Sequence, residues 1–152
     1  MKIARRSLAG IVITLLSTFA FAGNDSVRVQ DPWIREAPPV AKVLAAYMKI
    51  ENVGDDAQIL KGVSSPEFEH VMLHGSRIED GVAEMFHLDQ VEIQPGETAV
   101  FEPGGNHFML MGLKRPLRDG DNAVLNLDFG DGGTVSISVS VRRVAAGHTA
   151  HH

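Results

Sequence analysis

The feature that most constrains the fold of this chain is a series of short runs in which apolar and polar residues alternate. The clearest is TVSISVSV at 134–141, where every second residue from Val135 to Val141 is apolar and serines stand between them. Successive side chains of a β-strand point to opposite faces, so the pattern predicts a strand with one buried face. The preceding run, VLNLDF at 124–129, also alternates and leads into a turn at 131–133, so the two runs predict a β-hairpin.

Similar runs recur along the chain, separated by stretches rich in Gly and Pro. They lie near 26–30, 44–51, 58–63, 68–74, 82–86, 98–101 and 107–111. No window of the chain repeats apolar residues at helical spacing. Seven to nine short strands at this spacing predict an all-β, single-domain protein with a β-sandwich or barrel architecture.

The N-terminal 22 residues have the character of a secretory signal peptide. They begin with Lys2, Arg5 and Arg6, continue with an uncharged run, and end in small residues at 20–22. This pattern predicts export, by the general secretory or the twin-arginine route, and cleavage after Ala22. We therefore expect a mature domain over 23–144 without stable membrane insertion, followed by a flexible His-rich tail at 145–152.

The composition excludes several classes of partner and site. Beyond residue 22 the chain has 11 Lys and Arg against 19 Asp and Glu, which argues against nucleic acid or an anionic membrane surface as partner. There is no cysteine, so neither a disulfide framework nor a blue-copper centre can form. The carboxylates are scattered in turns and no catalytic motif is present, so we do not expect an enzyme. Any soft metal site must use methionine sulfur.

Histidines and methionines gather on single faces of two predicted strands. Residues two apart in a strand share a face, so His107, Met109 and Met111 project together, away from Phe108 and Leu110. The same alternation over 68–74 puts four residues on one face, with Val71 and Leu73 on the other; the four are Phe68, His70, Met72 and His74.

A further thioether, Met85, lies on the next predicted strand. We expect the turn between the two strands to be long enough to bring Met85 near His74. Thioethers are poor ligands for hard cations but suit Cu(I), and imidazole binds copper in both oxidation states. Two histidines and two methionines therefore predict a Cu(I) site, better suited to carrying the ion than to redox cycling.

The spacing of His74, Met85, His107 and Met109 follows the pattern H-x10-M-x21-H-x-M. This pattern is the signature of the PCu(A)C family of periplasmic copper chaperones, which the chain resembles over roughly residues 28 to 142. The segments DPWIREAPP and GGNHFMLMGLKRPL carry the resemblance further. It implies a cupredoxin-like Greek-key β-sandwich or barrel that binds Cu(I) through these four side chains.

The resemblance also implies a role and partners. Family members deliver copper in the periplasm to the copper-accepting subunit of cytochrome c oxidase, often beside a thioredoxin-like copper chaperone, and we expect a monomer. A periplasmic scavenger that sequesters copper is an alternative reading. An exported β-sandwich that only binds other proteins is another.

The remaining histidines and methionines have plainer interpretations. We expect Met48 and Met111 to fill the core, because an unbranched thioether packs irregular gaps well. For Met72, core filling and metal ligation are equally expected. His70 is expected at the surface, and His87 is not expected to touch the metal. The tail imidazoles, His148, His151 and His152, are either part of a plain mobile tail or ligands of a second ion, Cu(II).

Overall fold

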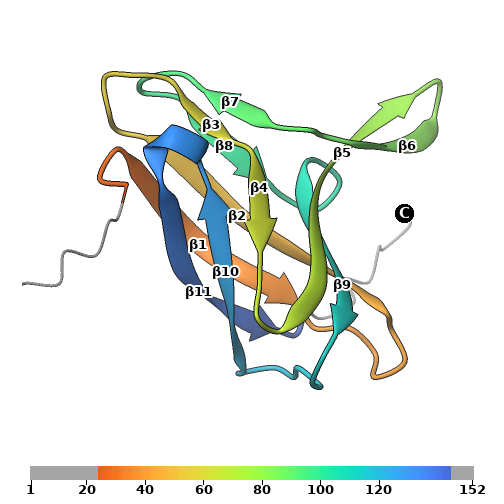
Figure 1. Cartoon of the computed structure of the whole chain (residues 1–152). Coiled ribbons are helices and arrows are strands. Elements are labelled where there is room, and N and C mark those ends of the chain that lie inside the picture. Colours follow the sequence, from red (N-terminus) through yellow and green to blue (C-terminus); the bar gives the residue numbers. More distant parts are fainter. Residues whose placement is uncertain (1–23, 145–152) are drawn as a thin grey trace, which may run out of the picture.

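The structure, a computed structural model that describes residues 24–144, is built from β-strands, as the alternating runs predict (Figure 1). A single 3-10 turn, η1 (Gly130–Gly132), joins the last two strands. The strands in chain order are β1 (Val27–Arg35), β2 (Val43–Asn52), β3 (Gln58–Leu60), β4 (Gly62–Ser64), β5 (Phe68–Glu79), β6 (Val82–His87), β7 (Val91–Ile93), β8 (Thr98–Phe101), β9 (His107–Leu113), β10 (Asn122–Asp128) and β11 (Thr134–Arg142).

The strands form one large, folded-over sheet and one small sheet. The large sheet has the order β4-β10-β11-β1-β2-β9-β5-β6, with β8 also paired to β2, and the small sheet pairs β3 with β7. The large sheet closes on itself, because β4 at one end contacts β5 near the other. The result is a sandwich from which the β5–β6 hairpin projects (Figure 1).

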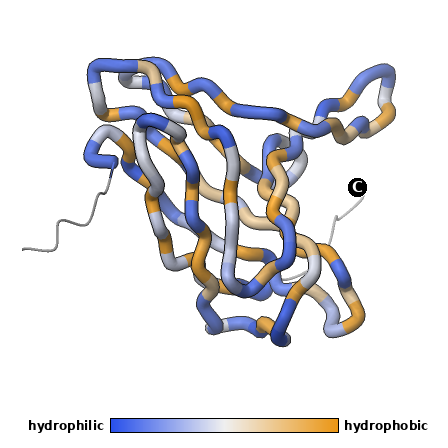
Figure 2. The backbone as a smooth tube through the Cα atoms, in the orientation of Figure 1, coloured by the Kyte–Doolittle hydropathy of each residue, from blue (hydrophilic) through white to orange (hydrophobic). Residues whose placement is uncertain are grey.

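The core lies between the two layers and is filled by the inward residues of the alternating runs. Leu125, Leu127, Val139 and Val141 are all buried, and the predicted β10–β11 hairpin forms in the register Leu125 opposite Ile137. Apolar and polar residues alternate along the strands in Figure 2. On β8 and β9, the rings of Phe101 and Phe108 stack with centroids 4.4 Å apart.

Strand β1 is longer than the sequence predicts. The Asp31-Pro32 dipeptide was expected to end a strand at residue 30, but β1 continues to Arg35. It does so through an irregularity, because the pairing with β2 shifts between Gln30 and Trp33 and Asp31 has a positive φ of 46°. A bulge of this kind lets a proline sit within a strand.

The hairpin between β5 and β6 also differs from its prediction. Strand β5 runs on to Glu79, and only Asp80 and Gly81 make the turn, with φ of 52° and 79°. Two consecutive positive φ values are typical of the tight two-residue hairpin turn that Asp-Gly favours. The long turn expected after His74 is therefore wrong. Strand β7, which has only three residues, was not predicted.

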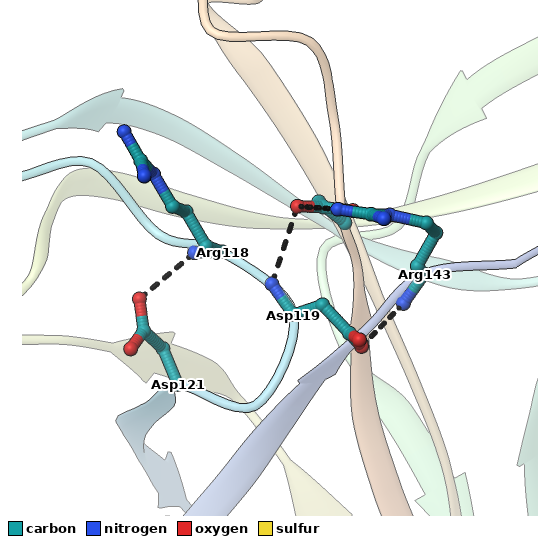
Figure 3. Close-up of polar contacts among 5 residues, drawn as sticks. Arg118, Asp119, Asp121 and Arg143 are labelled. Carbon is teal, nitrogen blue, oxygen red and sulfur yellow. Dashed lines mark hydrogen bonds and ion pairs between the residues drawn. The ribbon is translucent and has the colours of Figure 1, made fainter.

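At the C-terminal end of β9, a polar network ties the 114–121 loop to the end of β11 (Figure 3). The guanidinium of Arg143 donates to the Glu36 carboxylate at 2.6 Å, and the Asp119 backbone N–H donates to the same carboxylate at 3.2 Å. The Arg143 backbone N–H donates in turn to Asp119 at 2.8 Å. Beside this network lies a hollow of about 1100 Å³ with Lys42, Lys114 and Arg115 in its lining.

Within residues 24–144, no helix has the length and apolar character needed to cross a membrane.

Candidate metal centre

Six histidines and methionines face one another across strands β5 and β9. The two strands are antiparallel, and their register brings the side chains into three opposed pairs. We call this arrangement the His/Met ladder; its pairs are His74 with His107, Met72 with Met109, and His70 with Met111. The prediction that His107, Met109 and Met111 share a face is confirmed, because the intervening Phe108 and Leu110 are fully buried in the core.

One part of the β5 prediction is wrong. Phe68 was expected on the same face as His70, but Phe68 is 2% exposed and belongs to the apolar core, whereas His70 is exposed. Phe68 lies opposite Leu113 at the end of the pairing, next to Gly112, which has a positive φ of 68°. The ladder thus ends at the His70–Met111 pair.

The imidazole of His107 is held in one orientation. The side chain is only 8% exposed, and its Nδ1 lies 3.0 Å from the carbonyl oxygen of Gly105. A carbonyl oxygen only accepts hydrogen bonds, so Nδ1 carries the proton in this contact. In the neutral ring the other nitrogen, Nε2, then has a free lone pair, which is the arrangement typical of a metal-binding histidine.

Across from it, His74 has a ring nitrogen without a partner. Its Nδ1 is buried and forms no hydrogen bond in the described part of the chain. The ring centroids of His74 and His107 are 5.9 Å apart. Burial lowers the pKa of His74 below the ordinary value of 6.5, and the neighbouring His107 and His87 lower it further. The lowered pKa favours the neutral ring that a metal ligand must be. In the tautomer with the proton on Nε2, the buried Nδ1 has a lone pair that a bound cation would satisfy.

The other two predicted ligands, Met109 and Met85, lie on either side of this pair. Met109 is two residues from His107 on the same face of β9 and is half-buried. Met85 lies on β6 opposite Ser76, two residue pairs along the hairpin from His74, and is 54% exposed. Diagonal neighbours of this kind are about 7–8 Å apart, which a long side chain can span. The fold thus brings His74, His107 and Met109 together on β5 and β9, and Met85 is a diagonal neighbour of His74 at the sheet edge.

His87 is the residue that the sequence interpretation set aside. Because β5 extends to Glu79, His87 rather than Met85 lies directly opposite His74, and the two rings approach edge to face with centroids 5.6 Å apart. Its Nε2 is 3.6 Å from the carboxylate of Asp89. In the sequence, His87 could have been found from its position two residues after Met85, on the same face of the predicted strand. Its contact with His74, however, depends on the hairpin register, which the structure shows.

The β6 strand is positioned by Phe86, whose side chain points to the opposite side from Met85. A Cβ atom added to Gly75 would come within 2.5 Å of the Phe86 ring, so the ring packs directly on the glycine backbone. The Arg77 guanidinium lies 5.5 Å from the centre of the same ring and also pairs with Glu84 at 2.8 Å. These contacts hold the edge strand that carries Met85 and His87 beside β5.

The donor set limits the kinds of metal that could bind. Within residues 24–144, no three His, Asp or Glu side chains are grouped closely enough to hold an ion between them. Beside His74 and His107 the ladder offers the thioether of Met109, a donor that favours Cu(I) over Mg²⁺, Ca²⁺ or Zn²⁺. The predicted signal peptide and the tail residues His148, His151 and His152 lie outside the described residues.

The sequence of the chain is similar to those of known proteins. A family model described as "Putative lipoprotein LpqE-like" matches residues 27–141. The chain is 33% identical over 138 residues to "Putative lipoprotein Lxx21020" of Leifsonia xyli subsp. xyli, covering 89% of this chain and 82% of that protein.

Solved structures of similar fold include proteins in copper-bound form. DR1885 of Deinococcus radiodurans is similar in its apo form, with 29% identity, a TM-score of 0.63 and coverage of 97% and 98% of the two chains. Its Cu(I) form is 30% identical, with a TM-score of 0.60 and coverage of 76% of each chain. The copper-bound PCuAC domain from PmoF2 is 24% identical with a TM-score of 0.67, over 78% of this chain and 94% of that one. The all-β sandwich expected from the sequence is confirmed.

Proposed function

This chain belongs to the LpqE-like family, and from that premise we propose that it is an exported, non-enzymatic Cu(I) carrier. The observation that carries the proposal is the pairing of His74 with His107, beside Met109, on one face of β5 and β9. The buried, unpartnered Nδ1 of His74 and the oriented ring of His107 are what a metal would complete. The Cu(I) form of DR1885, which is 30% identical, supports copper as the cargo.

The ligands that we propose are His74, Met85, His107 and Met109. Two imidazoles and two thioethers stabilise the monovalent ion without a thiolate, which the chain lacks. Neither Cu(II) nor a harder cation gains much from thioether sulfur. Such a site keeps copper in one oxidation state, which suits transport and release rather than electron transfer.

The position of the site supports transfer to another protein. His107 is buried, but Met85 on the edge strand β6 is more than half exposed. An acceptor can therefore approach from the β6 side and replace the thioether of Met85 before the buried imidazole of His107 dissociates from the ion. Stepwise replacement of ligands keeps Cu(I) coordinated throughout the transfer, so the ion never has to lose all its ligands at once.

We propose the periplasm as the compartment and the copper-accepting subunit of cytochrome c oxidase as the acceptor, with a thioredoxin-like chaperone as a second partner. The lipoprotein names of the relatives support export. Sequestration is the competing role for the same site. Deletion of the gene distinguishes them: loss of oxidase activity that added copper restores favours delivery, whereas copper sensitivity with normal oxidase favours sequestration.

The direct test of the site is anaerobic Cu(I) titration of the protein followed by copper X-ray absorption. We expect the first equivalent to be bound by two imidazole nitrogens and two thioether sulfurs. A spectrum without sulfur scattering would rule out the ladder as the primary site. The tail contains histidines but no methionine, so an ion bound there would show nitrogen or oxygen ligands only.

A further inference from the structure

The His/Met ladder continues beyond the three of its members that we propose as ligands, His74, His107 and Met109. Its remaining members are Met72, opposite Met109, and the pair formed by His70 and Met111. These three side chains also line one hollow of about 430 Å³, together with Ser64, Ser65 and Glu69. Two thioethers and an imidazole thus border a space large enough for an ion and solvent.

The spacing of these residues allows them to reach a common point. Directly opposed residues of an antiparallel pair have Cβ atoms about 4.5–5.5 Å apart, and diagonal neighbours are about 7–8 Å apart. His70 and Met111 are directly opposed, and Met72 is diagonal to Met111. Methionine has three rotatable side-chain bonds, so both sulfurs can turn toward the imidazole.

Packing alone does not account for these methionines. Met48 shows what a packing methionine looks like in this protein, since it is 2% exposed and belongs to the buried apolar core. Met72 and Met111 are instead half-buried and border a hollow, on the face opposite to the core residues Leu73 and Leu110. The expectation that Met111 fills the core is therefore wrong.

The hollow also suits a positive charge. Glu69 is exposed and lines it, and Glu69 has no cationic partner within 4.0 Å in residues 24–144. A carboxylate close to the donors attracts a monovalent cation without itself being a preferred ligand for a soft ion. The same hollow contains no lysine or arginine in its lining.

We propose that His70, Met72 and Met111 form a second Cu(I) position, adjoining the first through the Met72–Met109 pair. The proposal rests on the proposed function, because the first position must bind Cu(I) for the second to adjoin it. Two positions that share a row of thioethers allow the ion to move between them without entering water. The second position has fewer buried ligands and binds more weakly than the first.

The test uses Ag(I), a redox-inert ion with the same preference for thioethers, and follows the methionine methyl groups by NMR. We expect the first equivalent to shift the methyl signals of Met85 and Met109 and the second to shift those of Met72 and Met111. An ion bound by the tail shifts no methionine methyl. Unmoved Met72 and Met111 signals after two equivalents would overturn the proposal.

A variant separates this proposal from the primary site. Met72→Leu with Met111→Leu keeps side-chain volume but removes both sulfurs, and we expect the second affinity to fall by at least about tenfold, since even outer-shell partners are worth 10–100-fold. The first affinity should remain. Met48→Leu is the matched control and should change neither. If the methyl signals of Met85 and Met109 also fail to shift in the unmodified protein, the proposed function itself fails. If those signals shift but the double variant binds the second equivalent of Ag(I) with unchanged affinity, only the second position is refuted.

Discussion

The two faces of the β5–β9 pair carry opposite kinds of side chain on the same backbone. One face contributes Leu73, Phe108 and Leu110 to the core, and each of these is at most 3% exposed. The other face carries only histidine and methionine at the paired positions from residue 70 to 74 and from 107 to 111. The difference appears between neighbouring residues, so it reflects the two-residue period of the strand rather than a separate domain or loop.

This division has a physical consequence. The apolar face supplies the burial that holds the strands in register, so the other face does not need to contribute to stability. It can therefore carry a ring nitrogen without a partner, as in His74, at a cost that the core offsets. Substitutions on the two faces should accordingly separate stability from metal binding.

The largest expected effect is on the apolar face. Phe108 is fully buried and stacks on Phe101, so Phe108→Ala should lower the free energy of unfolding by about 3–5 kcal/mol. Urea denaturation of the metal-free protein measures this loss. Val124→Ala, on an outward and partly exposed position of β10, is the control and should cost much less. Equal losses in the two variants would show that the apolar face of β9 does not hold the fold.

The next effect is on the metal-binding face, one residue away. His107→Ala should weaken Cu(I) binding by at least about 10- to 100-fold while the free energy of unfolding falls by only about 1 kcal/mol, the worth of its bond to Gly105. Competition with a chromophoric Cu(I) chelator measures the affinity. A variant that unfolds as readily as Phe108→Ala, or binds copper normally, would contradict the division between the faces.

These two faces could be predicted from the sequence, but the pairs across the strands could not. A period of two residues assigns each side chain to a face, and this was correct for His107, Met109 and Met111. It does not identify the opposing residue, because sliding β5 past β9 by two residues keeps both faces and changes every pair. The register depends on the whole sandwich, so the ladder became visible only in the structure.

The position of Met85 shows a second limit of the sequence. Asp80-Gly81 is a strong hairpin signal, but the sequence interpretation ended the strand at residue 74 and assigned the residues after it, 75–81, to the turn. In the structure the residues from Arg77 to Glu79 form an exposed extension of the hairpin and tolerate charge. This shift put His87 opposite His74 and moved Met85 to a diagonal position.

A smaller effect on stability is expected at Gly75, where the apolar face of β5 meets the edge strand β6. Gly75 lies under the Phe86 ring, so Gly75→Ala forces the ring outward and should cost about 1–2 kcal/mol, near the low end for overpacking because a ring edge can move. Hydrogen exchange of the β6 amides should accelerate as the strand loosens. Gly62→Ala is the matched control, since an added Cβ there meets nothing within 4 Å. Unchanged exchange in the Gly75 variant would mean that Phe86 does not hold β6 in place.

The smallest effect is the pH dependence that His74 gives to the metal-free protein. Its pKa in the folded state is lowered, mainly by burial, so between that pKa and 6.5 the unfolded chain takes up a proton that the folded protein does not. Stability is therefore fully present above pH 6.5 and is lost as the pH falls through the folded pKa. Glu36 and Asp31 act in a separate window, because arginine hydrogen bonds lower their pKa values from 4.5 and 3.8. Urea unfolding at pH 7.5, 6.5 and 5.5 measures the slope, and His74→Gln should flatten it; the same slope in both proteins would mean that the ring of His74 is as well solvated folded as unfolded.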